Sequence, residues 1–199
     1  MLSRFHAAYP GIELAIRQAG SVELVAAVEE GAVDVALVIL PIRHDVLETQ
    51  ALLREELVVA VARGHALGRR RTMAIADLRD VPLVMFREGY DLRTTTEAAC
   101  RAAGFAPTFA VEGGEMDGVL RLAAAGLGAA IVPSLVVPPH GELHAVRIVQ
   151  PSLTRTIGLA HRRDRRLSRA GEELLKTVRA LVRDRSWLKT SPPGLTVLR

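Results

Sequence analysis

The sequence predicts an α/β protein with two Rossmann-like lobes, and three observations support this fold class. Hydrophobic residues fill 49% of the 199 positions but aromatic residues only 4%, so the core has to be built from Ala, Val, Leu and Ile, as in sheets covered by helices. Apolar runs of strand length alternate with segments of helical periodicity. The strand-helix-strand order occurs in an early part of the chain and again in a later part, which indicates two similar lobes.

The first lobe is expected over residues 1–73 and 153–184, and its elements follow from apolar spacing and turn residues. In chain order they are a helix stopped by Pro10-Gly11, a strand over 12–17, a helix over 22–30 that Ser21 can cap and Gly31 ends, a strand over 33–40, strand-like stretches over 47–53 and 56–62, and, after the second lobe, a strand over 155–161 and a final helix capped by Ser168. The apolar run 33–40 is typical of a parallel strand buried on both faces.

The second lobe is expected over residues 74–152 and repeats the same order. Its elements are a short helix near 75–79, a strand over 82–86, a helix capped by Asp91 that runs to Gly104, a strand over 107–112, a helix opened by Glu115 or Met116 and ended by Gly126, a strand in GAAIVP and a strand over 143–149. Two crossings, near 72–80 and 150–155, would give the geometry of a hinge. Residues 185–199 are expected to be a mobile tail.

Charge and cysteine content narrow the class of protein. The net charge is +4. Because the arginines are spread along the chain, the support for a nucleic-acid-binding surface is weak. The runs 69–71 and 162–166 are interpreted as solvated loops, with an anion or partner contact as the alternative. No apolar run approaches the ~18 residues that span a membrane, and the first residues lack a signal-peptide pattern, so a cytoplasmic protein without a membrane partner is expected. Cys100, the one cysteine, is expected to be a small buried hydrophobe, or less simply a redox sensor.

Enzyme and metal signatures are not found. Gly126-Leu127-Gly128 imitates a dinucleotide fingerprint, but it follows a helix and lacks the third glycine, so it is interpreted as a helix C-cap. His140 and His144 have i, i+4 spacing without a third ligand nearby. The chain has no P-loop and no G-x-S-x-G elbow. We therefore expect no catalytic residues, no metal and no cofactor.

Acidic residues divide into two kinds. Asp34 interrupts an apolar run, so it is expected to be a buried acceptor of backbone amides or of an arginine, with a functional role as the alternative. The pairs Glu29-Glu30, Glu55-Glu56 and Glu172-Glu173 are expected to be solvated charges.

The turns that follow the predicted strands are the candidate binding site, because open α/β sheets bind ligands at the carboxyl ends of their strands. Backbone N–H groups at helix N-termini there favour anions. Ser21 could donate its hydroxyl or be a plain N-cap, and Arg87 could pair with a carboxylate ligand or lie in a surface ion pair. The candidate ligand-binding residues are Gly20, Ser21, Leu40, Phe86, Arg87, Gly114, Glu115, Met116 and Pro133.

Six segments in a fixed order resemble the effector-binding domain of LysR-type transcriptional regulators. The segments are FHAAYPGIEL (5–14), GSVELVAAVEEGAVDVALV (20–38), ELVVAVARGHAL (56–67), ADL (76–78) with the proline at 82, AAGLGAAIVP (124–133) and RTIGLAHRRDRRLSRAGEELL (155–175). Each segment alone is loosely matched, but their order and spacing over roughly residues 1–183 are specific.

The resemblance implies a type II periplasmic-binding-protein architecture, whose interlobe cleft binds a small, often anionic or aromatic, inducer. It implies a homodimer or higher oligomer in which the helix 22–30 packs against the helix 116–125 of a partner, through Leu24, Val25, Val28, Val119 and Leu120. Ligand binding would rearrange lobes or dimers and so bias promoter contacts. A stand-alone solute-binding protein, and less favourably an enzyme on the same scaffold, are the alternatives.

The sequence departs from the family pattern at its amino-terminal side. The winged helix-turn-helix is missing, so DNA contact is expected only through a module absent from this chain. The strand that precedes the first helix in the family is missing too. Unpaired buried backbone groups cost ~1–3 kcal/mol each, so we hypothesise that GLTVL (194–198) enters that gap, in cis or from a partner.

Overall fold

The computed structural model describes residues 2–42, 44–138, 140–184 and 194–198, and they divide into two compact units. The described part of unit 1 comprises residues 2–42, 44–54, 156–184 and 196–198, and that of unit 2 comprises 55–138 and 140–155 with 194 and 195. The first crossing therefore lies at Arg54–Glu55, where we expected it near 72–80. The reason is that Leu57–Ala62 pair with strands of unit 2, which assigns them to that unit.

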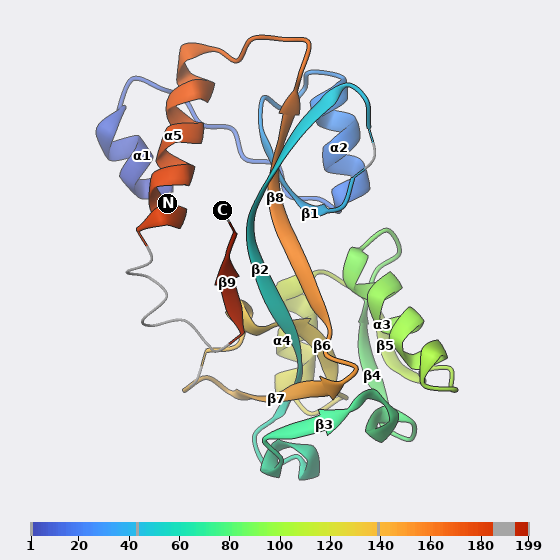
Figure 1. The fold of residues 1–199 in the computed structure, drawn as a ribbon. Coiled ribbons are helices and arrows are strands. Elements are labelled where there is room, and N and C mark those ends of the chain that lie inside the picture. The colour runs from blue at the N-terminus through green and yellow to red at the C-terminus, as the bar shows by residue number, and fades with distance from the viewer. Residues whose placement is uncertain (1, 43, 139, 185–193, 199) are drawn as a thin grey trace. The chain divides into compact units, whose positions relative to one another are not determined.

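Unit 1 is a small sheet with helices packed against it (Figure 1). Its elements are α1 (Leu2–Ala8), α2 (Ser21–Glu29), β1 (Ala36–Leu40), the first part of β2 (Leu47–Ala62), the greater part of β8 (Thr154–Arg162), α5 (Arg169–Arg183) and residues of β9 (Leu195–Val197). The strand order is β1-β8-β2, and β9 pairs with β2. β1 runs antiparallel to β8, with Ala36 opposite Ala160 and Leu40 opposite Thr156.

Helix α5 is held on the sheet of unit 1 by the apolar stripe that the sequence predicts. Leu175, Val178 and Val182 are buried against Leu52 of β2 and Leu159 of β8. The helix begins as expected, because the Ser168 hydroxyl accepts a 3.1 Å hydrogen bond from the Gly171 amide. Because α1 and α5 lie side by side, the Tyr9 hydroxyl, just beyond α1, donates a 2.9 Å hydrogen bond to the Glu173 carboxylate (Figure 1).

Residues 12–17 do not form the strand that their alternation predicts; the backbone there has no regular secondary structure. β1 is also not a parallel strand buried on both faces. It ends the strand order of the sheet, and 45% of Leu37 is exposed. A strand needs a neighbour for its backbone groups, and among the described residues 12–17 have none. Between 12–17 and Val33–Val35 lies a hollow of ≈ 310 Å³.

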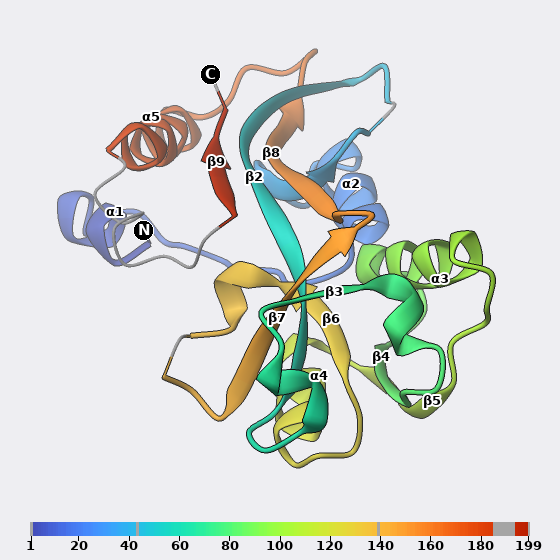
Figure 2. The ribbon, with the colours of Figure 1, turned by 60° about the horizontal axis from the view of Figure 1, so that its bottom comes forward.

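The carboxyl-terminal strand β9 pairs with β2 and not with β1, so part of the GLTVL segment joins the sheet; that it takes the place of the missing strand stays a hypothesis. The Glu56 amide donates to the Gly194 carbonyl and the Leu198 amide donates to the Leu52 carbonyl, both at 2.9 Å. Figures 1 and 2 both show β9 beside β2. The mobile tail was expected over 185–199. Residues 194–198 are described by the structure and include β9, and 185–193 lie outside the described residues.

Unit 2 is a sheet of mostly short strands built around the second part of β2 (Figure 2). Its other elements are the 3-10 turns η1 (Ala66–Arg69), η2 (Ile75–Leu78) and η3 (Ser134–Val136), the strands β3 (Thr72–Ala74), β4 (Leu83–Phe86), β5 (Phe109–Gly114), β6 (Ala130–Pro133) and β7 (Leu143–Gln150), and the helices α3 (Asp91–Ala102) and α4 (Met116–Ala124). β6 and β7 flank β2 as antiparallel neighbours, and β3 lies parallel to β7. β4 pairs in parallel with β5 as a separate two-stranded sheet, and Leu83 of β4 forms an isolated bridge with Ala129, the residue before β6.

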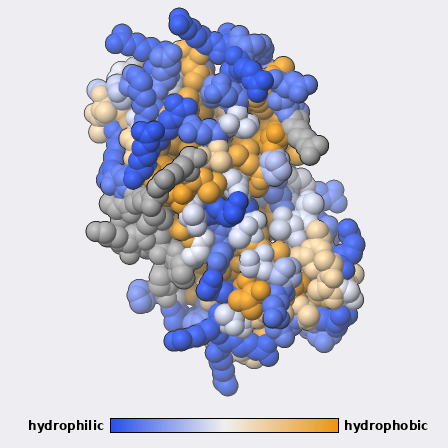
Figure 3. Space-filling view, in the orientation of Figure 1, coloured by the Kyte–Doolittle hydropathy of each residue, from blue (hydrophilic) through white to orange (hydrophobic). Residues whose placement is uncertain are grey.

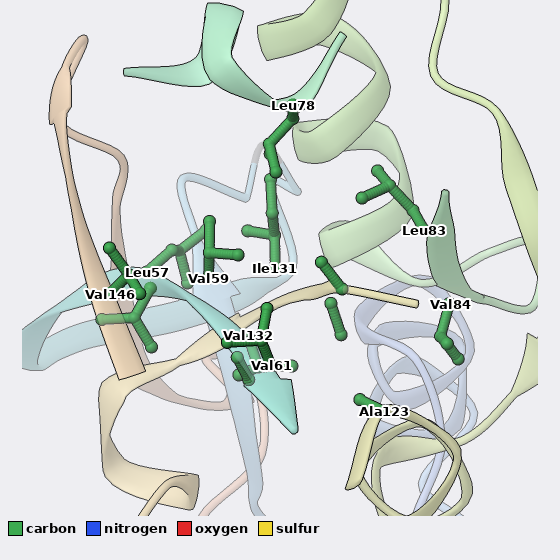
Figure 4. Packing of buried hydrophobic residues seen from close by; sticks show 14 of the residues in the cluster. Leu57, Val59, Val61, Leu78, Leu83, Val84, Ala123, Ile131, Val132 and Val146 are labelled. Atoms are coloured by element: carbon green, nitrogen blue, oxygen red, sulfur yellow. The ribbon is translucent and has the colours of Figure 1, made fainter. Parts of the chain in front are cut away.

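The core of unit 2 forms because apolar runs of β2, β4 and β6 all become buried. Val59, Ile131 and Leu83 are each at most 2% exposed. Figure 4 shows such side chains packed against Ala123 of α4 and Leu78 of η2. β2 is a single strand of 16 residues where the sequence predicts two stretches, because Arg54 and Glu55 continue the extended backbone.

Hydrophilic residues cover much of the face shown in Figure 3, and the hydrophobic residues there form separate patches. Over the part of the chain that the structure describes, no helix is both long and apolar enough to cross a membrane.

Candidate functional site

Five of the nine candidate residues come together in unit 2, at the carboxyl ends of β4 and β5. These strands are parallel, and after two shifts in register Phe86 lies opposite Gly114. Arg87 follows Phe86 in the chain, and Glu115 follows Gly114. Met116 then begins α4, with Glu115 as its N-cap residue. Pro133, the sixth candidate of this unit, ends β6, which lies next to β4. The structure thus brings these turns to the carboxyl ends of neighbouring strands, and their contact with a ligand stays a prediction.

Arg87 is the positively charged group of this cluster. Its backbone amide donates a 3.1 Å hydrogen bond to the Gly114 carbonyl, which fixes the turn. Its Nε lies 3.4 Å from the Glu115 carboxylate, in an exposed ion pair. The guanidinium carbon is also 5.0 Å from the centre of the Tyr90 ring, which stacks on Phe86 with ring centres 5.6 Å apart. An exposed ion pair of this kind is weak, so an incoming anion can replace Glu115 as the partner of Arg87.

Arg93 supports the cluster and was not identified from the sequence. Its guanidinium donates to the Phe86 carbonyl at 3.2 Å and to the Glu112 carboxylate at 2.9 Å, while its Nε donates to Glu97 at 3.0 Å. The hydrogen bond that Arg93 donates to Glu112 is the main reason that the pKa of Arg93 is raised. Arg93 therefore ties α3 to the ends of both strands. Its i, i+4 spacing from Glu97 is the sequence signal that could have revealed it.

The remaining candidates, Gly20, Ser21 and Leu40, lie in unit 1. Ser21 does not cap α2 as expected: Gly20 is the N-cap residue and Ser21 is the first residue of the helix. The Ser21 hydroxyl instead accepts a 3.2 Å hydrogen bond from the Ile39 amide of β1. Ser21 thus joins the start of α2 to the end of β1, one residue before Leu40.

Helices α2 and α4, which begin directly after candidate residues Gly20 and Glu115, start without a side-chain cap. No side chain caps α2 at Gly20 or α4 at Glu115. The first amides of a helix carry partial positive charge, and without a capping side chain they favour an anion. The arrangement within each unit can therefore bind an anionic group, and in unit 2 the Arg87 side chain adds a full positive charge.

The residues expected at a dimer interface are largely occupied within their own units. Val28 and Val119 are 0% exposed and Val25 is 5% exposed, so these side chains have almost no surface to offer a partner. The helical periodicity identified the apolar face correctly, but that face packs on the sheet. Leu24 and Leu120 are only partly buried, and Val22 on the outer face of α2 is 76% exposed.

Several other expectations can be compared with the structure. Asp34 is exposed, so it is not a buried acceptor, because β1 begins only at Ala36. Glu55 was expected to be solvated but is 0% exposed and paired with Arg155. The Gly126 turn is a helix C-cap as expected: the Gly126 and Leu127 amides donate to Ala123 and Leu122, and Gly126 has a φ of 83°.

Cys100 is buried, as expected, and burial raises the pKa of its thiol. His140 and His144 are exposed. Within the described ranges, no three His, Cys, Asp or Glu side chains gather as metal ligands do.

A family profile described as the LysR substrate binding domain matches residues 1–183 of the chain. The chain belongs to the LysR family. Transcriptional dual regulator GltC of Bacillus subtilis (strain 168) is 29% identical over 181 residues, which are 89% of this chain and 60% of the relative. This LysR domain thus spans about 60% of the length of such curated relatives, which are transcriptional regulators and not enzymes.

Two solved structures share the α/β fold of this chain. The regulatory domain of CcmR from Synechocystis PCC6803, in complex with 2-PG, has a TM-score of 0.81 at 21% identity, covering 92% of this chain and 89% of that one. The effector-binding domain of QuiR, in complex with shikimate, has a TM-score of 0.79 at 19% identity, covering 92% and 88%. Identities this low show the fold alone.

Proposed function

We propose that this LysR domain senses a small anionic effector and thereby controls transcription through a separate DNA-binding module. The observation that carries the proposal is the grouping of Arg87 with the uncapped start of α4 at the carboxyl ends of β4 and β5. Positive charge and free amides at one place favour a carboxylate or phosphate. The two solved relatives that hold 2-PG and shikimate support the choice of a small ligand.

The roles of the candidate residues follow from their contacts. Arg87 releases Glu115 and pairs with the effector. Phe86 and Tyr90 supply a flat apolar surface. Gly114 leaves room beside α4, since a Cβ there would lie 3.0 Å from the Val119 side chain. Met116 and Pro133 border this surface. In unit 1, Gly20, Ser21 and Leu40 are the proposed contacts, with the uncapped α2 as a second anion-binding group.

A thermal-shift screen tests the proposal. We expect at least one carboxylate from a panel of small organic acids to raise the melting temperature, because a ligand at 100 times its Kd stabilises the folded state by ~2.7 kcal/mol. Arg87→Ala should abolish the shift, and Ser21→Ala should reduce it. The matched control is Arg101→Ala, since Arg101 is an exposed arginine of α3 away from these turns. Equal stabilisation by the neutral amides of the same acids would contradict an anion site.

We also propose that the protein acts in the cytoplasm as a homodimer or higher oligomer, with α2 of one copy against α4 of another. The exposed Val22, together with Leu24 and Leu120, supplies the apolar contact. Light scattering after size exclusion tests this: Val22→Glu should give monomers, while Leu127→Glu, a control at a residue 42% exposed outside both helices, should not change the mass. A monomeric native protein would overturn the dimer proposal without affecting effector binding.

A further inference from the structure

Unit 2 also has a hollow, which lies on the face of the sheet formed by β2, β7 and β3. Its volume is ≈ 470 Å³, which is within the range of small-molecule sites. Thr72, Arg147 and Val58 form one row across the three strands at its floor, and the chain from Ser134 to Pro138 makes the opposite wall. None of the residues proposed to contact the effector lines this hollow.

The wall contains a buried hydroxyl without a partner. Ser134 is 3% exposed, and its Oγ makes no hydrogen bond to any described residue. Buried hydroxyls in folded proteins normally have a partner, because the group gives up its hydrogen bonds to water when it is buried. Rotation about one side-chain bond turns the Ser134 hydroxyl, so it can donate to a ligand that enters the hollow.

The charges around the hollow leave an excess of positive charge. Arg147 is neutralised by Glu56 through two hydrogen bonds of 3.0 and 2.8 Å. Arg70 lies 3.3 Å from the Asp77 carboxylate. The guanidinium of Arg71, in contrast, has no acidic partner among the described residues, and no carboxylate lines the hollow. The rim therefore attracts a ligand with a single negative charge.

The deeper walls are apolar. Val58 and Val137 are each 3% exposed and Leu143 is 8% exposed, so each contributes a small part of its side chain to the lining of the hollow. An inorganic anion would leave these walls in contact with water, and a neutral hydrocarbon would leave Arg71 and Ser134 unused. Only a ligand with both an apolar part and a negative charge contacts the whole lining of the hollow.

We propose that this hollow is a second ligand site, which takes a small amphipathic monocarboxylate. The apolar body of the ligand packs on Val58, Val137 and Leu143, the carboxylate pairs with Arg71, and Ser134 donates a hydrogen bond to it. Exposed His144 forms part of the remaining rim.

Benzoate is the probe, and ¹H–¹⁵N spectra of the whole 199-residue chain report where it binds. We expect saturable shifts of the amides of Thr72 and Ala145, with a Kd about tenfold weaker in Arg71→Ala, the loss expected from removing one charge-assisted contact. Arg69→Ala, which removes an exposed arginine two residues away that does not line the hollow, should bind as the native protein does. Arg87→Ala should leave these shifts unchanged as well, which separates this site from the effector site.

Ser134→Ala separates binding from folding. Without benzoate the variant should melt at a higher temperature, because a buried unpartnered hydroxyl is removed, yet it should bind benzoate more weakly. Ala145→Leu should block binding by filling the hollow, with far-UV circular dichroism as the check that it folds. The proposal is overturned if benzoate produces no shifts at Thr72 and Ala145, if benzyl alcohol or inorganic phosphate binds there as tightly as benzoate, or if Arg69→Ala weakens binding as much as Arg71→Ala.

Discussion

The Glu55 carboxylate accepts a 2.6 Å hydrogen bond from Arg155 Nε, and these two residues are the first and last of the continuous segment that makes up most of unit 2. Glu55 is 0% exposed and Arg155 is 20% exposed. The second carboxylate oxygen of Glu55 has no partner among the described residues. A buried charge is tolerated only when it is paired, so Glu55 requires Arg155 as its partner. The ion pair thereby joins the first and last residues of the segment.

Glu55→Ala should destabilise the protein strongly, by about 3 kcal/mol, because it leaves Arg155 partly buried without its partner. Urea unfolding followed by circular dichroism measures the loss. Glu48→Ala is the control, since Glu48 is an exposed carboxylate on the same strand β2. If both variants lose the same free energy of unfolding, the buried pair is not the cause.

The contact between Tyr9 and Glu173 should make stability depend on pH. Hydrogen bonds from Lys176 and then from Tyr9 lower the pKa of Glu173 below its ordinary 4.5. A carboxyl whose pKa is lower in the folded state stabilises the protein above its unfolded pKa, and this contribution is lost as the pH falls through the folded value.

Tyr9→Phe should therefore melt at a lower temperature than the native protein at pH 7, and the difference should shrink at pH 3. The hydrogen bond to Glu173 also raises the pKa of Tyr9 above 10.0, so its contribution is lost as the pH rises past that raised value. Melting curves of the native protein and of Tyr9→Phe at pH 3 and pH 7 measure this difference. A difference that does not change with pH would show that the hydroxyl does not act through the Glu173 charge.

Cys100 should be unreactive in the native protein. Its side chain is 0% exposed and burial raises the pKa of its thiol, so the thiolate that reacts with alkylating agents is scarce. We expect no modification by iodoacetamide in buffer and complete modification in urea, measured by mass spectrometry. Rapid labelling of the folded protein would reopen the redox-sensor alternative.

Two nearby glycines should respond differently to a methyl group. Gly126 has a φ of 83° with open space around a Cβ, so Gly126→Ala should cost only the backbone strain, about 1 kcal/mol. At Gly128 a Cβ would lie 2.6 Å from the Pro82 carbonyl, so Gly128→Ala has to move β4 or β6 and should cost more. Chemical unfolding of both variants compares them; a larger loss at Gly126 would refute the close approach of these strands.

Elements with strong local signals could be predicted from the sequence. The stripe of Leu175, Val178 and Val182 and the cap at Ser168 are sufficient to define α5, because each depends on residues within a few positions. The grouping of Arg87 with Glu115 was predictable for a similar reason: parallel strands place their carboxyl ends at one edge.

Expectations failed where the outcome depends on distant partners. Residues 12–17 alternate as a strand does, but alternation does not supply a neighbour to pair with. The burial of Glu55 depends on Arg155, which is far away in the sequence, and apolar periodicity could not decide whether Val28 and Val119 face their own core or a partner. Periodicity identifies the apolar face of an element but not what covers it.

The outer edge of β1 has a practical consequence. Leu37 is 45% exposed at the end of the sheet, and the Ile39 amide of the same strand donates to the Ser21 hydroxyl. An edge strand with an exposed apolar residue invites another extended chain to dock by backbone hydrogen bonds. A charged side chain in place of Leu37 should therefore reduce self-association of the purified protein through this edge.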